Sequence, residues 1–341
     1  MKKVNVAIIG VGRIGKIHLN NMLRHFPDAN VVAVADTHFP ADQFKKDYPG
    51  IFFSSDPAEV VVKPEVEAVI ICTPTSSHAA MIELSIKSGK HLFCEKPVDL
   101  SLSRTKSLVE KADAAKIKLM LGFNRRFDPD FMEARKNILS GRIGDIQIVK
   151  ITSRDPGLPP IDYIKNSGGL FMDMAIHDFD MARYLMGKEV KEVYAKGLVL
   201  VDEKVRAAGD IDTALTTLIF EDGTYAVIDN SRKAIYGYDQ RIEVFGSKGM
   251  IQVENNLHNR NVVFDAEGIH HALPLDFFMD RYAASYLNEI RHFIDALAGK
   301  SPLPVSGDDG LKATIIAVAA KKSVDEGRVV TVDEIYKEIS K

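Results

Sequence analysis

Residues 168–187 read GGLFMDMAIHDFDMARYLMG and place an Asp and a His four positions apart in an otherwise apolar stretch. If the stretch is helical, Asp173, His177 and Asp180 share one narrow stripe, because residues three and four apart lie on the same helix face. A carboxylate beside an imidazole suits proton transfer, since histidine titrates near neutral pH. The alternative is a buried histidine whose ring is satisfied by an Asp one turn away.

Two glycines directly before this stretch favour a functional interpretation. Gly168 and Gly169 let the backbone approach a ligand closely, whereas a purely structural helix start needs only one capping residue. Asp and His at this spacing also coordinate zinc in some proteins, but no third protein ligand stands at an obvious spacing. We therefore predict a stripe that faces a ligand, and no metal.

A second motif with a chemical purpose lies near the N-terminus. GVGRIG (residues 10–15) follows a short apolar run and precedes a helix-like segment, and Asp36 ends the next predicted strand. In a dinucleotide site, Gly10 permits the turn, Gly12 lets the pyrophosphate approach the backbone, and Gly15 lets helix and strand pack closely. The N–H groups at the helix start favour the anion.

The same residues also spell GxxxxGK, the opening of a nucleotide triphosphate P-loop. That motif continues with Ser or Thr to hold magnesium, and Ile17 stands there instead. Asp36 favours a dinucleotide, because its carboxylate accepts hydrogen bonds from ribose hydroxyls and repels a 2′-phosphate. Thr37, His38 and Phe39 bring no arginine that would reverse this preference. We therefore predict NAD rather than NADP as the cofactor.

Two further polar segments follow predicted strands of the same sheet. TPTSSH (residues 73–78) comes directly after Cys72, and its hydroxyl groups either cap the next helix or border the cofactor. EKP (residues 95–97) comes directly after Cys94. Lys96 is either a solvated side chain or a cation beside the crevice at the carboxyl ends of the strands.

The elements that must position these groups fall into two patterns. Up to residue 122, short apolar runs alternate with helix-like segments, which indicates βαβ units and a buried parallel sheet. Strands are predicted at 4–9, 31–35, 68–72, 91–94 and 118–121, and helices at 14–26, 41–48, 77–88 and 101–115. Beyond residue 122, strands of a meander are predicted at 146–153, 191–200, 213–220, 225–230, 241–245 and 250–253, with helices near 129–139, 170–186, 280–298 and 309–325.

We therefore predict an α/β protein with an N-terminal Rossmann domain, a doubly wound parallel sheet over residues 1–122, and a C-terminal α+β domain over residues 123–341. The first domain is expected to bind NAD. The second is expected to bind the substrate and to form the oligomer.

Composition excludes several classes of protein. The chain has 341 residues, of which 46% are hydrophobic, and 44 Lys plus Arg against 47 Asp plus Glu give a formal charge of 44 − 47 = −3. This balance, with no basic block, argues against a nucleic-acid partner. Cys72 and Cys94 form no zinc or disulfide pattern, and neither a signal peptide nor a run of 18 apolar residues occurs. We expect a cytoplasmic protein with no membrane partner.

Four motifs in order, GVGRIG, TPTSSH, EKP and GGLFMDMAIHDFDMA, resemble the glucose–fructose oxidoreductase, inositol dehydrogenase and rhizopine catabolism family. The resemblance covers nearly the whole chain. The segments FNRRFDPDF (123–131), ITSRDP (151–156) and DNSRKAIYGYDQRIEVFGSKG (229–249) are most similar to the bacterial inositol 2-dehydrogenases within it. The family fold is a Rossmann domain followed by a domain with a large open, mainly antiparallel sheet, commonly assembled into tetramers.

The resemblance also implies a catalytic cluster of Lys96, Asp173 and His177. Oxidation of an alcohol needs a base within hydrogen-bond reach of the hydroxyl, and His177 is the candidate base. Asp173 is expected to orient the imidazole or a neighbouring hydroxyl, and Lys96 to favour the developing alkoxide.

Two sets of binding residues are predicted. Those for the cofactor lie at the ends of the Rossmann strands and at the first helix: Gly10, Gly12, Arg13, Ile14, Gly15, Asp36, Thr73, Thr75, His78, Glu95 and Lys96. Those for the substrate are polar residues of the family-like segments: Lys96, Arg126, Arg154, Asp155, Asp173, His177 and Tyr236. Arg126 is alternatively a surface arginine in a salt bridge, and Tyr236 an aromatic residue at a strand end.

The expected function is NAD-dependent oxidation of a ring hydroxyl of a small cyclitol, with myo-inositol 2-dehydrogenation first. Scyllo-inositol and aldoses are the alternatives within the family. A dinucleotide-binding regulator and a glycosidase that oxidises its substrate transiently are the alternatives of other classes. We further expect a homo-oligomer, a tetramer by the resemblance.

Overall fold

The computed structural model describes residues 3–339, and the chain forms two compact units. The first unit comprises residues 1–127 and 284–312, and the second comprises residues 128–283 and 313–341. The predicted boundary at residue 122 divides the chain once. The observed units instead exchange a segment, because residues 284–312 pack with the N-terminal part of the chain.

The first unit is built on a six-stranded parallel sheet with the order β3-β2-β1-β4-β5-β6. This is the strand order of a dinucleotide-binding Rossmann fold, with its reversal between β1 and β4. The strands are β1 (Val4–Ile9), β2 (Ala29–Ala35), β3 (Phe52–Ser54), β4 (Ala68–Ile71), β5 (His91–Cys94) and β6 (Leu119–Leu121). The connecting helices are α1 (Arg13–His25), α2 (Ala41–Asp47), α3 (Pro57–Val61), α4 (Thr75–Lys87) and α5 (Leu102–Ala114). The predicted doubly wound sheet is confirmed.

A helix from far along the chain completes this unit. Helix α11 (Ala283–Leu297) places Phe293 against Phe93 of β5, with ring centroids 5.9 Å apart, and both rings are fully buried. On its exposed side, Arg291 donates to Asp28, whose pKa that hydrogen bond lowers against the raising effect of burial. Sequence periodicity locates the helix but carries no information about which sheet it covers.

The second unit contains a seven-stranded mixed sheet with the order β12-β11-β7-β10-β9-β8-β15. Its strands are β7 (Ile146–Arg154), β8 (Val190–Leu198), β9 (Thr213–Phe220), β10 (Tyr225–Ser231), β11 (Asp239–Gly246), β12 (Gly249–Val253) and β15 (Val330–Thr331). All pairs are antiparallel except β7 with β10. The mainly antiparallel sheet is confirmed, but the meander was wrong, because β7 inserts between β10 and β11.

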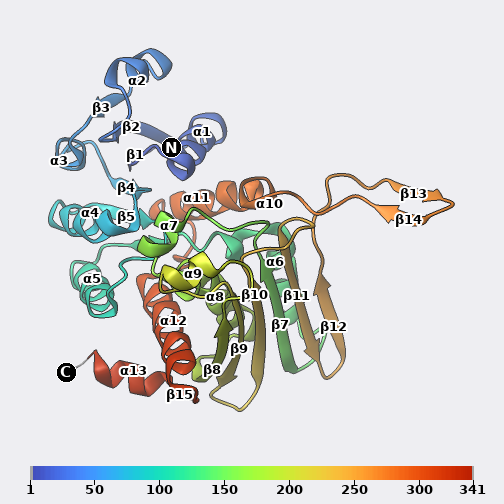
Figure 1. The fold of residues 1–341 in the computed structure, drawn as a ribbon. Helices are drawn as coiled ribbons and strands as arrows, with labels where there is room; N and C mark the ends of the chain where they lie inside the picture. Colours follow the sequence, from blue (N-terminus) through green and yellow to red (C-terminus); the bar gives the residue numbers. More distant parts are fainter. Residues whose placement is uncertain (1–2, 340–341) are drawn as a thin grey trace. The chain divides into compact units, whose positions relative to one another are not determined.

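Helices pack on one face of this sheet and leave the other open. These helices are α6 (Pro129–Leu139), α8 (Ile176–Met186), α12 (Gly307–Glu326), which begins in the first unit, and α13 (Val332–Glu338) (Figure 1). The short helices α7 (Ile161–Asn166) and α9 (Glu203–Ala207) pack against each other around Ile164 and Val205. Buried and exposed positions alternate along β9 and β10, as the two-residue period of a strand requires. Asn230, on the buried face of β10, donates to Asp178 of α8.

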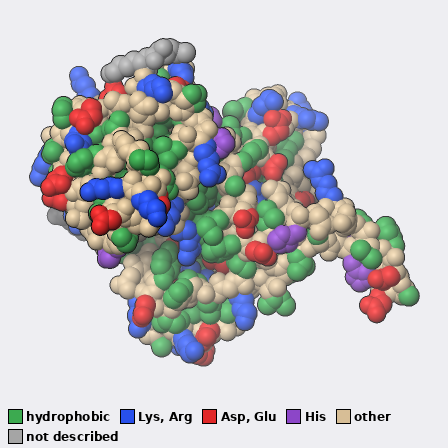
Figure 2. All heavy atoms as spheres, turned by 90° about the horizontal axis from the view of Figure 1, so that it is seen from above, with side chains coloured by type: hydrophobic (Ala, Val, Ile, Leu, Met, Phe, Trp, Pro, Cys, Tyr) green, Lys and Arg blue, Asp and Glu red, His purple; other side chains and the backbone are tan. Residues whose placement is uncertain are grey.

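A two-stranded hairpin of β13 (Val262–Asp265) and β14 (Gly268–His271) extends from the second unit, next to the short helix α10 (Phe278–Arg281). Every residue of both strands is exposed, including Phe264 at 73% and Ile269 at 63%. Figure 2 shows hydrophobic, acidic and histidine side chains together on this arm, at the right of the view.

The predicted helix at 170–186 is not a uniform α-helix. Its first part, Phe171–Ala175, is a π-helical turn, and regular α8 follows. A π-turn inserts an extra residue and changes the phase of the side chains, and such turns are frequent at functional sites. The simple i, i+4 spacing of Asp173 and His177 therefore does not describe this segment.

A buried ion pair fixes the start of α6. Asp128 accepts from the backbone N–H groups of Asp130 and Phe131 with one carboxylate oxygen and from Arg281 of α10 with the other. The side chains of Asp128 and Arg281 are 2% and 1% exposed. Removing one partner of such a pair leaves an uncompensated buried charge.

We expect Asp128→Ala to destabilise the second unit by about 3 kcal/mol or more, because the Arg281 guanidinium loses its buried partner and α6 loses its cap. Urea unfolding followed by circular dichroism measures this change. Asp130→Ala, an exposed carboxylate in the same helical turn, is the matched control and should change stability by less than about 0.5 kcal/mol. Equal losses in the two variants would contradict the importance of the pair.

Candidate active site

The first unit contains a cavity of about 650 Å³ at the carboxyl ends of β1, β2 and β4. In an open parallel sheet this edge, beside the reversal of strand order, is where ligands bind. The lining residues come from the strand ends and the loops that follow them: Ile9, Gly10, Val11, Gly12, Ala35, Asp36, Thr37, His38, Phe39, Pro40, Pro57, Cys72, Thr73, Pro74, Ser77 and Met81. Four predicted cofactor residues, Gly10, Gly12, Asp36 and Thr73, are among them.

The glycines of GVGRIG have the geometry that a dinucleotide requires. Gly10 adopts a φ of +88°, and a Cβ on Gly15 would lie 1.9 Å from the Gly10 carbonyl oxygen. A Cβ on Gly12 would meet no atom within 4 Å, so its position borders open space. Helix α1 begins at Arg13 and Ile14 with no side-chain cap, which leaves the first N–H groups for an anion. These residues fit the pyrophosphate of NAD.

Asp36 follows β2 and is held by backbone donors. Its Oδ2 accepts from Val11 N at 2.8 Å, and its Oδ1 accepts from His38 N and Phe39 N, each at 2.8 Å. Burial raises the pKa of Asp36, but these three hydrogen bonds outweigh it and leave the pKa below its ordinary value. The carboxylate is therefore ionised at neutral pH, and its Oδ2 has one lone pair left for a ribose hydroxyl.

The P-loop alternative finds no support in the position of its lysine. The ammonium of Lys16 lies 5.0 Å from the centroid of the Phe39 ring, a cation–π arrangement within the first unit. Ile17 follows it in α1. Lys16 therefore packs beside the loop after β2.

The TPTSSH loop is organised by its own side chains. Ser77 donates to the Thr73 hydroxyl or to the Pro74 carbonyl, each at 2.8 Å, while α4 begins at Thr75 without a side-chain cap. The ring of His78 is 1% exposed and bridges two backbone carbonyls, Thr73 O at 2.8 Å and Pro97 O at 2.7 Å. The side chain of His78 therefore ties this loop to the EKP segment.

Lys96 follows β5 and is half-buried. The residue before it, Glu95, contacts His18 of α1, with 3.0 Å between Glu95 Oε1 and His18 Nε2. A Cβ on Gly122, after β6, would lie 2.8 Å from Glu95 Oε2. The carboxylate of Glu95 is thus packed between α1 and the end of β6, and the structure gives it protein partners.

Asp173 in the second unit is held by two side chains. Tyr163 donates to its Oδ1 at 2.7 Å, and Arg232 donates to its Oδ2 at 3.2 Å. Loss of hydration around the hydroxyl, followed by the Asp173 charge, raises the pKa of Tyr163 well above its usual value. The hydroxyl is therefore a proton donor at all ordinary pH values, and Asp173 is oriented by a Tyr and an Arg.

The structure gives a packing reason for glycine at the position directly before Leu170. A Cβ on Gly169 would lie 2.6 Å from Asp210 Oδ1, the same oxygen that accepts from Leu170 N at 3.1 Å. Gly169 also has a φ of +81°, and Gly168 one of +86°. At Gly169 the close approach is made by Asp210, and the expectation that the pair admits a ligand stays a prediction.

The stripe of the opening sequence is only partly exposed. His177 is half-buried near the start of α8, whereas Asp178 and Asp180 are 0% and 1% exposed. Asp178 accepts from Asn230 at 2.8 Å, and Asp180 lies 3.9 Å from Arg183. Asp180 therefore belongs to the packing of α8, and Asp173 and His177 are the accessible pair of this segment.

The predicted substrate residues lie in different parts of the structure. Arg154 donates to Asp229 and, at 3.1 Å, to Tyr236, whose own hydroxyl donates to Asp239 at 2.6 Å. These strand positions alternate with the buried ones, so Arg154 lies on the open face of the sheet, opposite α8. Asp155 instead follows the strand and is near Tyr163, since its charge contributes to the raised pKa of that hydroxyl.

Arg126 is in the first unit, 9% exposed, and donates to Asp309 Oδ1 at 2.9 Å. This contact matches the alternative of an arginine in a salt bridge. Its assignment to the substrate stays a prediction.

Three residues around Asp173 were not found from the sequence. They are Tyr163, Arg232 and Asp210, where Arg232 Nη2 lies 3.7 Å from Asp210 Oδ2 and its side chain is 1% exposed. Arg232 lies in segment 229–249, which resembles the inositol 2-dehydrogenases, so the sequence could have indicated it as a site residue. The sequence contains no comparable signal for Tyr163 and Asp210, because their distance from Asp173 and Arg232 depends on how α7 and the loop after α9 fold.

Comparison with known proteins identifies the family. Residues 4–123 match the model of an oxidoreductase family with an NAD-binding Rossmann fold, and residues 131–252 match the GFO/IDH/MocA C-terminal domain. The chain belongs to the GFO/IDH/MocA family. The recognition made from the four motifs is confirmed, and the protein is an NAD-binding oxidoreductase.

Three similar proteins are full-length matches. The chain is 45% identical to the myo-inositol 2-dehydrogenase of Thermotoga maritima, covering 97% of this chain and 99% of that one. It is 46% identical to the inositol 2-dehydrogenase of Rhizobium meliloti, covering 96% and 99%. The structure of scyllo-inositol dehydrogenase from Lactobacillus casei with bound NAD(H) and scyllo-inositol superposes with a TM-score of 0.89 at 31% identity, covering 97% of this chain and all of that one.

The helices were also tested for membrane-spanning character. Within residues 3–339, none is both long enough and apolar enough to cross a membrane.

We expect Asp36→Ala to lower NAD affinity by roughly ten- to a hundredfold, because a hydrogen bond to a charged group contributes about 1.5–3 kcal/mol. Calorimetric titration with NAD measures the change, and Asp42→Ala on exposed α2 is the control. The lowered pKa of Asp36 keeps it ionised down to low pH, so wild-type affinity should not fall between pH 8 and pH 5.5. Unchanged NAD affinity in Asp36→Ala would contradict its role.

Proposed function

We propose that this protein is an NAD-dependent inositol 2-dehydrogenase, which oxidises a ring hydroxyl of myo-inositol to the 2-keto inosose. The observation that carries the proposal is the combination of a cavity lined by Gly10, Gly12 and Asp36 in an NAD-binding Rossmann fold with Lys96, Asp173 and His177 at the motif positions of a dehydrogenase family. Relatives at 45% and 46% identity over nearly their whole length are named inositol 2-dehydrogenases, which supports this substrate.

The proposed reaction assigns one task to each polar group. His177 accepts the proton of the substrate hydroxyl, since histidine is the side chain whose unperturbed pKa lies nearest neutrality. Lys96 stabilises the negative charge that develops on that oxygen. Bound NAD supplies the hydride acceptor, so the carbinol carbon loses a hydride while the oxygen loses a proton.

Asp173 is proposed to hold the substrate hydroxyls and the imidazole in place. Its two oxygens accept from Tyr163 and Arg232, which fixes the plane of the carboxylate. A negative charge near His177 also stabilises the imidazolium formed after proton transfer.

The most specific part of the proposal is the choice of myo-inositol among the inositol stereoisomers. Scyllo-inositol is the alternative supported by the structure of the Lactobacillus casei enzyme, and an aldose is the alternative within the wider family. Two other classes also use such a fold: a regulator that binds NAD without turnover, and a glycosidase that recovers its NAD unchanged. A regulator has no chemical need for Lys96, Asp173 and His177.

The function is tested by absorbance of NADH with myo-inositol, scyllo-inositol, chiro-inositol, glucose and xylose, each with NAD and with NADP. We expect NAD reduction, fastest with myo-inositol. NAD binding without turnover on any substrate would contradict the dehydrogenase and favour the regulator. Hydrolysis of a glycoside without net NADH would favour the glycosidase.

His177→Ala should lower kcat by about a hundred- to ten-thousandfold, the usual contribution of a general base, with NAD affinity unchanged. The loss should be partly recovered at high pH, where hydroxide replaces the base. His258→Ala, in the same unit and paired with Asp276, is the control. Near-normal turnover of His177→Ala at neutral pH would assign the base elsewhere.

We also propose that the open face of the second sheet is covered by another copy of the chain, as in a tetramer. The cross-strand register aligns a row of apolar side chains over five strands on this face: Ile219, Tyr225, Ile148, Phe245 and Met250. Tyr225, Phe245 and Met250 are 41%, 42% and 47% exposed. A continuous apolar row of this kind is typical of an interface.

Tyr225→Glu is expected to shift the protein to a smaller mass in size-exclusion chromatography with light scattering, because a carboxylate in an apolar interface is costly to desolvate. Lys165→Glu on exposed α7 changes the charge equally and should leave the mass unchanged. A wild-type monomer would contradict the oligomer.

A further inference from the structure

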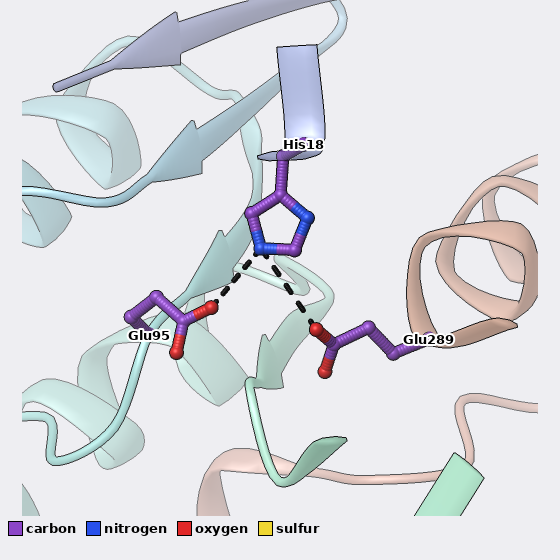
Figure 3. A group of neighbouring side chains, drawn as sticks. All are labelled: His18, Glu95 and Glu289. Atoms are coloured by element: carbon purple, nitrogen blue, oxygen red, sulfur yellow. Dashed lines mark hydrogen bonds and ion pairs between the residues drawn. The ribbon is translucent and has the colours of Figure 1, made fainter. Parts of the chain in front are cut away.

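A buried group of two carboxyls and one imidazole lies in the first unit. His18 comes from α1, Glu95 follows β5, and Glu289 comes from α11, and the three side chains point toward one another (Figure 3). His18 and Glu289 are 0% exposed and Glu95 is 16% exposed. Their facing nitrogen and oxygen atoms all lie within 4.8 Å of one another.

The contacts within this group are unequal. His18 Nε2 is 3.0 Å from Glu95 Oε1, a hydrogen-bond distance, but 3.8 Å from Glu289 Oε1. Among the described residues, neither carboxyl oxygen of Glu289 has a hydrogen-bond partner. The group therefore consists of a bonded His18–Glu95 pair beside a second carboxyl.

Burial determines the charge of that second carboxyl. A carboxylate without donors in a fully buried position costs several kcal/mol, so the group binds a proton instead. Burial, then the Glu95 charge, raises the pKa of Glu289 well above its usual range. The nearby thiols of Cys72 and Cys94 also have raised pKa values, chiefly through burial. Within the cluster, the Glu95 carboxyl is the one at hydrogen-bond distance from the His18 ring.

The surroundings leave Glu95 little freedom. The rings of Phe93 and Tyr286 pack edge-on against His18, with centroids 5.3 Å and 5.8 Å away. On the opposite side, a Cβ on Gly122 would lie 2.8 Å from Glu95 Oε2, so a side chain there would make the carboxylate shift. The His18 imidazole and the Gly122 backbone thus define a slot for the Glu95 side chain.

This slot matters because of what stands next in the chain. Lys96 lies between Glu95, which His18 holds, and Pro97, whose carbonyl is held by His78 at 2.7 Å. The backbone on both sides of Lys96 is therefore fixed by buried histidines from two different helices, α1 and α4. A catalytic ammonium needs such support, since small displacements of a charged group cost transition-state stabilisation.

We propose that His18, through the carboxylate of Glu95 and with Glu289 held as a neutral acid beside it, is a positioning residue for Lys96. The inference rests on the proposed function, because it takes Lys96 to act on the substrate hydroxyl. It assigns His18 and Glu289 no contact with substrate or cofactor. Turnover then depends on the His18–Glu95 hydrogen bond, and His18 belongs to α1, the helix whose N-terminus borders the dinucleotide site.

The alternative occupant of such a group is a divalent metal ion. Tetrahedral ligands of zinc at about 2.1 Å lie about 3.4 Å from one another. The His18–Glu95 distance of 3.0 Å is shorter and suits a shared hydrogen, and the His18–Glu289 distance of 3.8 Å is longer. The geometry thus favours a proton over a metal, and the metal becomes an outcome of the test.

The kinetic test compares His18→Phe, which keeps a ring against Phe93 and Tyr286 but removes the donor, with His18→Gln, which places an amide N–H near the same position. We expect His18→Phe to lower kcat at least tenfold with NAD affinity within about threefold of wild type, and His18→Gln to recover most of the loss. His25→Phe, at the exposed end of α1, is the matched control. A normal kcat in a folded His18→Phe overturns the proposal.

Gly122→Ala tests the same slot from the other side. Its methyl group displaces the Glu95 carboxylate without changing any residue that lines the cofactor cavity. We expect a fall in kcat and slower labelling of Lys96 by pyridoxal phosphate with borohydride, located by peptide mass. Gly249→Ala, where the added Cβ meets only ordinary contacts, is the control. Unchanged kcat and unchanged labelling would overturn the positioning role.

The neutral acid has its own readout. The infrared difference between wild type and Glu289→Gln at pH 7 should contain the carbonyl stretch of a protonated carboxylic acid, and its absence overturns that part of the proposal. One equivalent of metal in purified wild type, lost in Glu289→Gln, overturns it in favour of a metal site. These spectra and the labelling need no turnover. If no substrate is oxidised, the proposed function is refuted, but the spectra and the labelling still test the cluster. If Lys96→Ala is inactive while His18→Phe has a normal kcat, the positioning role of His18 is refuted and the proposed function stands.

Discussion

The closest approach between helix and strand in the first unit occurs at Gly15. A Cβ there would lie 1.9 Å from the Gly10 carbonyl oxygen and 3.3 Å from the Cys72 Cβ, so any side chain would push α1 away from β1 and β4. With α1 at this distance, its uncapped N-terminus faces the cavity. The same approach sets the position of His18, one turn further along the helix, against Glu95 at the end of β5. One glycine contact therefore governs both the anion site and the support behind Lys96.

The carboxyl ends of the strands are linked to one another by buried polar contacts rather than by strand pairing alone. Asp36 after β2 accepts from Val11 after β1, and His78 joins Thr73 after β4 to Pro97 after β5. The first link joins the loops after β1 and β2, and the second joins the loops after β4 and β5. Such links keep a binding site rigid without adding side chains to the cavity itself.

Local chemistry was predictable from the sequence, and long-range placement was not. GVGRIG and Asp36 act within one βαβ unit, so their spacing alone predicted the cofactor site and the preference for NAD. The position of β7 between β10 and β11 was missed, because hydrophobic alternation locates a strand but does not say which strand it pairs with. Glu289 was missed for the same reason. It lies on a helix nearly 200 residues from Glu95, and the burial and the Glu95 charge that raise its pKa arise only in the folded chain.

The two carboxylates of the second unit show why residue type alone did not identify their roles. Asp173 and Asp210 both approach Arg232, at 3.2 Å and 3.7 Å. Asp210 also accepts from the backbone at Leu170 and lies so close to Gly169 that a Cβ would clash. It is thereby committed to shaping the start of the π-helical turn. Asp173 is held by Arg232 and Tyr163, and its role toward a polyol stays a prediction. Arg232 thus balances two negative charges with one guanidinium. Arg232 thereby couples the orientation of Asp173 to the backbone of the π-helical turn, which Asp210 holds.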